Sequence, residues 1–180
     1  HNGQTNGAYM NHHLGMTVEI DFRQPANGKI NMGTQGMQPM SFLFSGDDDV
    51  WVFIDDVLVL DLGGIHSEIY GTIDFSNGEV SVGQSWKTNG FPMKADGTVD
   101  VAALQENSIQ HTTIKAQFIN ALGEEAANAL SWRGDTFASE TNHTLKMFFL
   151  ERGNYDSSLA VRFNLQPPLP QQIKKVDQEG

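Results

Sequence analysis

The sequence predicts a mainly β, antiparallel domain with one partly helical segment. Short apolar runs of strand length recur along the chain, separated by clusters of Gly, Asn and Asp. Two of these runs, 50–54 and 57–62, are joined by only two residues, the connection length of a β-hairpin. With 180 residues, of which 39% are hydrophobic, the chain is long enough for one domain with a substantial core.

The first half of the chain reads as strands and turns. Residues 1–16 are polar and rich in Gly and Asn, so we expect an irregular lead-in. "TVEIDF" (17–22) alternates as a half-buried strand does, and "PANGK" supplies a turn. "MSFLFS" opens a strand that runs to an acidic triplet. "VWVFI" and "VLVLDL" then pair across Asp55-Asp56, where glycine would suit the turn better, so the turn type stays open.

The second half adds the helical segment and two more strands. Short strand-like pieces continue to about residue 83, and residues 86–98 are rich in turn formers. Apolar residues at four-residue spacing, followed by "GEEAANAL", predict one or two helices between about 100 and 131, interrupted at Gly123. "TLKMFFLE" and "LAVRFNL" are further strands, joined by the polar loop "RGNYDSS". "QPPLP" (166–170) favours an extended linker, which predicts a domain boundary near residue 166.

Composition excludes several functions. The formal net charge is −11 and no cluster of Lys and Arg occurs, which argues against binding to nucleic acid and to anionic membranes. No apolar run approaches the length of a transmembrane helix. The absence of cysteine excludes disulfides, thiolate metal sites and cysteine nucleophiles. Metal cations, neutral sugars and basic surfaces remain as partners.

The triplet Asp47, Asp48 and Asp49 is the main candidate site. Two carboxylates about 4 Å apart repel by roughly 4 kcal/mol at an effective dielectric of about 20, so the triplet is either a solvated turn or neutralised by a cation. Its position after a buried strand favours the cation. Calcium prefers several oxygen ligands, and the loop 152–158 could add Asn154 and Asp156. The spacing excludes an EF-hand.

A resemblance to a known family covers roughly residues 12–165. "FLFSGDDDVWVFIDDVLVLDLGGIH" resembles the signature of the fibro-slime domain, a module of bacterial surface proteins. That domain is related to the protective-antigen-type β-sandwich shared with yeast flocculin and epithelial-adhesin lectins, and "FFLERGNYDSSLAVRF" is similar to its closing strand-loop-strand. The resemblance implies an antiparallel β-sandwich. It also implies that Asp47 and Asp48, joined by a cis peptide bond, bind Ca²⁺, with Asn154 and then Asp156 as further ligands.

The tail implies an architecture for the longer protein. "IKKVDQEG" resembles the opening of a collagen-adhesin B-type repeat of Gram-positive surface stalks, in which Lys174 or Lys175 would form an isopeptide bond. Residues 1–165 would then be a ligand-binding head domain, and residues 166–180 a Pro-rich linker and the start of a stalk repeat. This predicts an extracellular, cell-wall-anchored protein with a monomeric head.

Other residues carry two interpretations. Candidate ligand contacts are Asp49, His66, Tyr155 and Trp86; Phe91 and Trp132 could also stack on a sugar ring, whereas Trp51 is expected in the core. His66 could instead be a core histidine satisfied by a backbone hydrogen bond. We expect Asp61 to accept hydrogen bonds beneath Gly63-Gly64, and Glu151 to pair with Arg152.

These observations predict a calcium-dependent carbohydrate-binding head of a bacterial adhesin that binds glycans or glycoproteins on host or neighbouring cells. The alternative is a structural or protein-binding surface module in which calcium, if present, only stabilises loops. We predict no enzymatic activity, because glycoside hydrolysis needs two carboxylates across a cleft and the sequence places no such pair.

Overall fold

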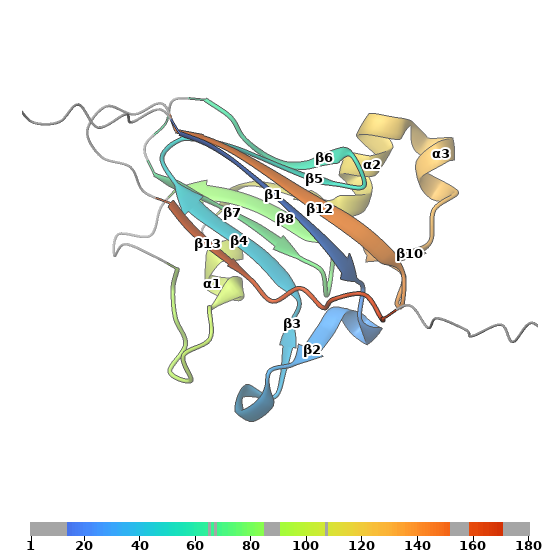
Figure 1. Cartoon of the computed structure of the whole chain (residues 1–180), viewed down its shortest axis with the longest axis horizontal. Coiled ribbons are helices and arrows are strands. Elements are labelled where there is room, and N and C mark those ends of the chain that lie inside the picture. Colours follow the sequence, from blue (N-terminus) through green and yellow to red (C-terminus); the bar gives the residue numbers. More distant parts are fainter. Residues whose placement is uncertain are drawn as a thin grey trace, which may run out of the picture.

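The protein is an antiparallel β-sandwich, as the sequence predicts (Figure 1). The computed structural model describes residues 14–64, 66, 68–84, 91–106, 108–151 and 159–170. One sheet has four strands in the order β1–β12–β5–β6, and the other has five in the order β13–β4–β7–β8–β9. These strands are β1 (Leu14–Arg23), β4 (Ser41–Gly46), β5 (Asp49–Ile54), β6 (Val57–Leu62), β7 (Ile69–Asp74), β8 (Glu79–Gln84), β9 (Ser108–Thr113), β12 (Asn142–Glu151) and β13 (Leu159–Phe163).

Two short sheets and several short helices lie outside the two large sheets. Two short two-stranded sheets pair β2 with β3 and β10 with β11. Their strands are β2 (Lys29–Asn31), β3 (Met37–Pro39), β10 (Trp132–Arg133) and β11 (Thr136–Phe137). The helices are η1 (Ala26–Gly28), η2 (Gly33–Gln35), α1 (Val101–Glu106), α2 (Ile114–Leu122) and α3 (Glu124–Asn128). Among the described helices, none has the length and apolarity needed to cross a membrane.

The core lies between the two large sheets because side chains alternate between the faces of each strand. Val50, Val52 and Ile54 of β5 are completely buried, and they belong to the same apolar cluster as Phe42 and Phe44 of β4. This cluster extends over both sheets and includes residues of α2 and α3. Burial of these side chains on one face of each sheet supplies the main stabilisation of the sandwich.

Trp51 corrects one expectation. It was expected in the core, but it lies on the outer face of the four-stranded sheet, opposite Phe148 of β12, and is only half-buried. Phe53 is on the same outer face and packs edge-on against Phe148, with ring centroids 5.7 Å apart. Successive side chains of a strand point to opposite faces, so Val50 and Val52 point inward and Trp51 points outward. Because every residue of this run is apolar, the sequence does not show which face is buried.

The β5–β6 hairpin forms as predicted, and its turn type is now defined. Asp55 and Asp56 both have positive φ, 49° and 65°, as a type I′ turn requires. Their carboxylates are tied to β12. Asp55 Oδ1 accepts a hydrogen bond from Thr144 N at 2.9 Å, and Asp56 Oδ1 accepts one from Lys146 Nζ at 2.6 Å. That bond to Asp56 raises the pKa of Lys146 above its usual value. These tethers explain how two aspartates occupy a turn that favours glycine.

The segment 100–131 is partly helical, as predicted, but it contains three helices and a strand where one or two helices were expected. Strand β9 lies between α1 and α2 and extends the five-stranded sheet by pairing with β8. The interruption at Gly123 is confirmed, since α2 ends before it and α3 begins after it. The side chain of Thr113, the last residue of β9, caps α2 by accepting a hydrogen bond from Ala116 N. The same residue therefore ends the strand and caps the helix.

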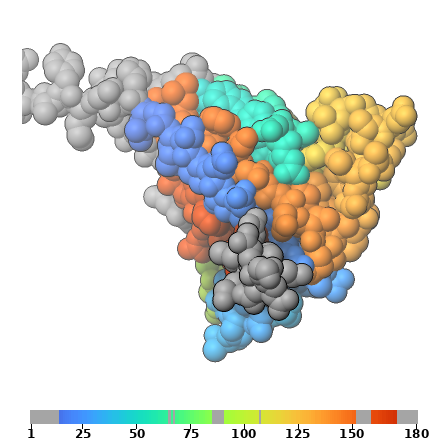
Figure 2. Space-filling view, turned by 45° about the vertical axis from the view of Figure 1, so that its right-hand side comes forward, coloured from blue at the N-terminus to red at the C-terminus, as the bar shows by residue number. Residues whose placement is uncertain are grey.

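Helices α2 and α3 form a lobe beside the four-stranded sheet (Figure 2). Phe118 of α2 is 2% exposed and packs edge-on against Trp132 and Phe137. Beyond β13, residues 164–170 have no helix or strand, and the Gln166 carbonyl accepts a hydrogen bond from Arg23 N. The stalk repeat predicted after them, with Lys174 and Lys175, lies outside the described residues.

Asp74, at the end of β7, should make the stability of the fold depend on pH. Burial raises the pKa of Asp74, although the amide and hydroxyl of Ser76 partly lower it by donating to Oδ1. The folded state therefore binds a proton more readily than the unfolded state, so stability falls as pH rises from 3.8 through the folded pKa. In Asp74→Asn the amide oxygen still accepts both bonds but carries no charge. We expect urea titrations to show that the stability advantage of Asp74→Asn over wild type grows as pH rises above about 4.

A matched substitution should give the opposite trend. Donors of Thr98 lower the pKa of the exposed carboxyl of Asp96, so Asp96→Asn should lose stability relative to wild type as pH rises. A difference between Asp74→Asn and wild type that stays constant with pH would contradict the assignment for Asp74.

Candidate metal centre

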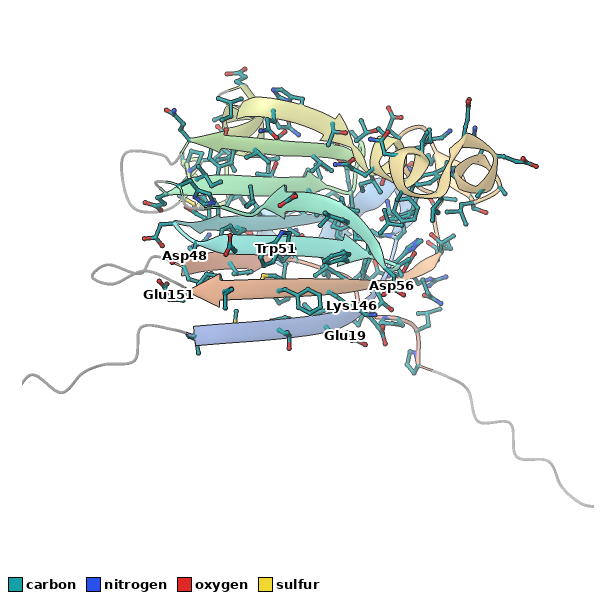
Figure 3. The ribbon with its side chains drawn as sticks, turned by 90° about the horizontal axis from the view of Figure 1, so that it is seen from above. Glu19, Asp48, Trp51, Asp56, Lys146 and Glu151 are labelled. Carbon is teal, nitrogen blue, oxygen red and sulfur yellow. The ribbon has the colours of Figure 1, made fainter. Side chains whose placement is uncertain are left out.

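Two connections between the sheets lie at one end of the sandwich, where strand β12 also ends. Asp47 and Asp48 join β4 of one sheet to β5 of the other, and residues 63–68 join β6 to β7. Strand β12 ends beside the start of β5, with Leu150 opposite Asp49, and leads toward β13 through residues 152–158. Figure 3 shows Asp48 and Glu151 at this end and Asp56 at the opposite end, near the helices.

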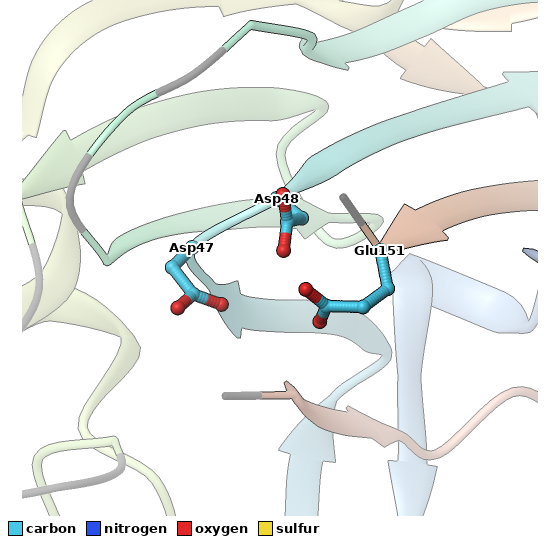
Figure 4. A group of neighbouring side chains, drawn as sticks. All are labelled: Asp47, Asp48 and Glu151. Carbon is cyan, nitrogen blue, oxygen red and sulfur yellow. The ribbon is translucent and has the colours of Figure 1, made fainter. Parts of the chain in front are cut away.

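Three carboxylates converge there. Asp47, Asp48 and Glu151 each place an oxygen so that all three oxygens lie within 4.8 Å of one another. Figure 4 shows the carboxylates of the three residues directed toward a common space. Asp48 is only 7% exposed and Glu151 only 3%. Two of the three acids are therefore largely removed from water, which strengthens their repulsion and the attraction of a cation.

The local sequence explains why Glu151 faces inward. In β12 the residues Leu145, Met147 and Phe149 point into the core, and Glu151 is the next residue in that alternating series. The pattern therefore places an acid on the buried face where the strand reaches the end of the sandwich. Sequence reasoning missed this residue as a metal ligand and assigned it an ion pair with Arg152, which lies outside the described residues.

The donor set fits a hard divalent cation. All three donors are carboxylates, the ligand type that calcium prefers, at Ca–O distances of about 2.3–2.6 Å. Two oxygens bound to one calcium ion can be no more than about 5 Å apart, twice the bond length. The mutual separations within 4.8 Å satisfy that limit. Asp47, Asp48 and Glu151 are thus suited to hold calcium, and Asn154 and Asp156, the other predicted ligands, lie outside the described residues.

The peptide bond between Asp47 and Asp48 is trans, so the expectation of a cis bond was wrong. A cis bond without proline costs about 3–4 kcal/mol. The two adjacent carboxylates reach the common space with an ordinary trans bond, and the third comes from β12.

Asp49 and Asp61 hold the β6–β7 connection. Asp49 is 2% exposed, and its Oδ1 accepts a hydrogen bond from Gly64 N. Asp61 Oδ1 accepts one from Gly63 N at 2.9 Å, which confirms the expectation for Asp61. The adjacent acids therefore have different surroundings: Asp47 and Asp48 join the carboxylate cluster, whereas Asp49 faces the neighbouring connection. A direct ligand contact by Asp49 stays a prediction.

His66 lies in the same β6–β7 connection. Its Nε2 lies 2.9 Å from the Leu62 carbonyl, which agrees with the interpretation of a histidine satisfied by the backbone. A nearby acid, Glu68, accepts a hydrogen bond from Ser45 Oγ at 2.9 Å. This end of the sandwich is thus rich in acids beyond the triad.

The aromatic candidates for sugar stacking have different positions. Phe91 is 9% exposed and belongs to a small apolar cluster against the outer face of the five-stranded sheet. Trp132 stacks on Phe137, with ring centroids 5.2 Å apart, and its Nε1 donates to the Ala127 carbonyl. Both residues therefore contribute to packing. The remaining candidates, Trp86 and Tyr155, lie outside the described residues.

Comparisons with known proteins give short, local likenesses. A stretch of 36 residues, 20% of the chain, is 67% identical to Protein psiF of Dictyostelium discoideum. Another comparison gives 52% identity over 50 residues to Protein psiD, and a third gives 37% over 73 residues, 41% of the chain, to Protein psiH, both of the same organism. The chain spans a tenth or less of the length of these relatives. No family model and no solved structure matches the chain.

Proposed function

We propose that this chain is a calcium-dependent carbohydrate-binding module of a cell-surface adhesin. The observation that carries the proposal is the cluster of Asp47 and Asp48, from the connection between β4 and β5, with Glu151, the last residue of β12. The resemblance of residues 42–66 to the fibro-slime signature supports the same assignment, because the related lectins bind sugar through calcium held by an aspartate pair.

Calcium leaves room for a ligand in such a site. It takes six to eight oxygen ligands, and three carboxylates fill only part of that number unless all bind through both oxygens. When bound, the ion would offer its remaining positions to neighbouring hydroxyl groups of a sugar. Asp47, Asp48 and Glu151 hold the ion, and the rigid strand ends on which they lie fix the direction from which a sugar approaches.

A glycan array tests the proposal. We expect wild-type protein to bind a subset of glycans in about 1 mM calcium and to lose that binding in excess chelator. Asp48→Ala should bind none under either condition, because one of the two buried acids in the cluster is gone. Asp61→Asn is the matched control, since it removes an exposed charge near the same end that is not part of the cluster and keeps an oxygen that can accept from Gly63 N.

The array also separates the alternative function. If calcium raises the melting temperature while the array stays blank, the cluster stabilises the connections and the chain is a structural or protein-binding surface module. Glycan binding that persists in chelator or in Asp48→Ala would contradict a calcium-dependent site.

A further inference from the structure

A groove of about 390 Å³ lies on the opposite side of the five-stranded sheet from the core. Its floor is formed by Leu43 of β4, whose neighbours Phe42 and Phe44 point the other way into the core. Strand β13, the hairpin around residues 93–99 and the β2–β3 arm surround it. At about 3.3 Å per strand residue, its Ser41 end is roughly 20 Å from Asp47, so the groove is separate from the acidic cluster.

The walls of the groove are held by contacts between segments that are distant in sequence. Gln35 Nε2 donates to the Asp96 carbonyl at 3.5 Å and links the β2–β3 arm to the hairpin. Asn164 Oδ1 accepts from Ser41 N at 2.6 Å, and its Nδ2 donates to the Pro39 carbonyl at 2.9 Å. The groove is therefore a formed feature of the fold, within the size range of sites for small molecules.

The charge of the groove is opposite to that of the whole chain. The chain has a formal charge of −11, yet among the residues that the structure describes no acid lines the groove, and Arg162 is the single charged residue that does. Arg162 lies opposite Leu43 across the β13–β4 pair, and Nη1 contacts Met93 Sδ at 3.8 Å. No described carboxylate forms an ion pair with it. Asp96, on the neighbouring hairpin, directs its carboxylate to Thr98 N and Oγ1.

The rest of the lining is apolar or neutral. Val99 and Val101 contribute apolar surface beside Leu43, and Gln38 adds an amide. A planar guanidinium binds a carboxylate through two parallel hydrogen bonds, and one cation matches one negative charge. A phosphate or a polyanion would need more cations than the groove supplies, and the overall negative charge would repel it.

We propose that this groove binds a small organic acid, a carboxylate attached to an apolar aliphatic or aromatic body. Arg162 holds the carboxylate, and the apolar side chains around Leu43 cover the body. The site does not depend on the acidic cluster, so it functions with or without calcium.

Two probes, 4-phenylbutyrate and decanoate, test the site and distinguish an aromatic from an aliphatic body. Binding is measured by chemical-shift changes of backbone amides in the full 180-residue chain, in chelator and at about 0.15 M salt, where distant charges are screened. We expect saturable shifts at β13 and at the 93–99 hairpin with at least one probe. The matching neutral amide should bind at least about tenfold more weakly, equivalent to about 1.4 kcal/mol.

Variants assign the binding to named residues. Arg162→Gln should bring the affinity for the acid down to that for the amide, whereas Lys29→Gln, which removes an exposed cation outside the groove, should not. Gln38→Trp should block both ligands by filling the groove, and its spectrum reports whether the fold is kept. Equal affinity for acid and amide, shifts confined to other surfaces, or no saturable binding of either acid would overturn the proposal.

Discussion

Calcium should raise the unfolding temperature of the wild-type chain, and Asp48→Asn and Glu151→Gln should each remove most of that rise. A ligand present at 100 times its dissociation constant stabilises the folded state by about 2.7 kcal/mol when it does not bind the unfolded chain. For a protein of this size, that corresponds to a rise of roughly 5–11 °C. Differential scanning calorimetry with and without calcium measures the rise.

The reason for the expected loss lies in the donor set. Each substitution keeps the shape of the side chain but replaces a charged ligand by a weaker neutral oxygen, and calcium affinity depends strongly on ligand charge. The measured quantity is the difference between the calcium and chelator scans of the same variant. Any effect of the substitution on the metal-free protein therefore cancels.

Asp61→Asn provides the control for this prediction. It also removes one negative charge near this end of the sandwich, but Asp61 is exposed and is not part of the triad. It should keep the full response to calcium. A wild-type chain with no response, or an Asp48→Asn variant with a full response, would show that the three carboxylates do not bind calcium.

The strands could be predicted from sequence because their patterns are strong and local. The two-residue hairpin link and the alternating residues of 17–22 determine which face of a strand is buried. Strand β9 was missed because its side chains are mostly exposed or half-buried and carry no alternating apolar pattern. It is a strand because its backbone pairs with β8, an interaction between distant parts of the chain.

The site was partly predictable for the same reason. Asp47 and Asp48 are adjacent in sequence, so their repulsion is visible without a structure. Glu151 is about a hundred residues away, and only the pairing of β12 with β5 brings it to them. A signal was nonetheless present, since Glu151 continues the inward series of Leu145, Met147 and Phe149. The place of Glu151 in the alternating series of core residues is therefore a better indicator of its role than its adjacency to Arg152 in the sequence.

Gly78→Ala should be among the most damaging single substitutions in this chain, with a loss of about 4 kcal/mol or more in the free energy of unfolding. Gly78 has φ of +86°, and an added Cβ would lie 2.2 Å from the Asp135 carbonyl oxygen and 2.7 Å from Thr136 N. These are backbone atoms, so no side-chain rotation relieves the overlap. The Gly78 carbonyl also accepts a hydrogen bond from Ile114 N, at the start of α2.

Gly97→Ala separates the two causes of this loss. Gly97 has a similar φ of +81°, but no atom lies within 4 Å of the position of an added Cβ. It should therefore show only the cost of a left-handed residue with a side chain, about 1–2 kcal/mol. Urea denaturation of both variants measures the difference, which reports the steric contact between the β7–β8 turn and the β10–β11 hairpin. Equal losses of unfolding free energy in the two variants would mean that the β10–β11 hairpin moves aside to accept the added Cβ of Gly78→Ala.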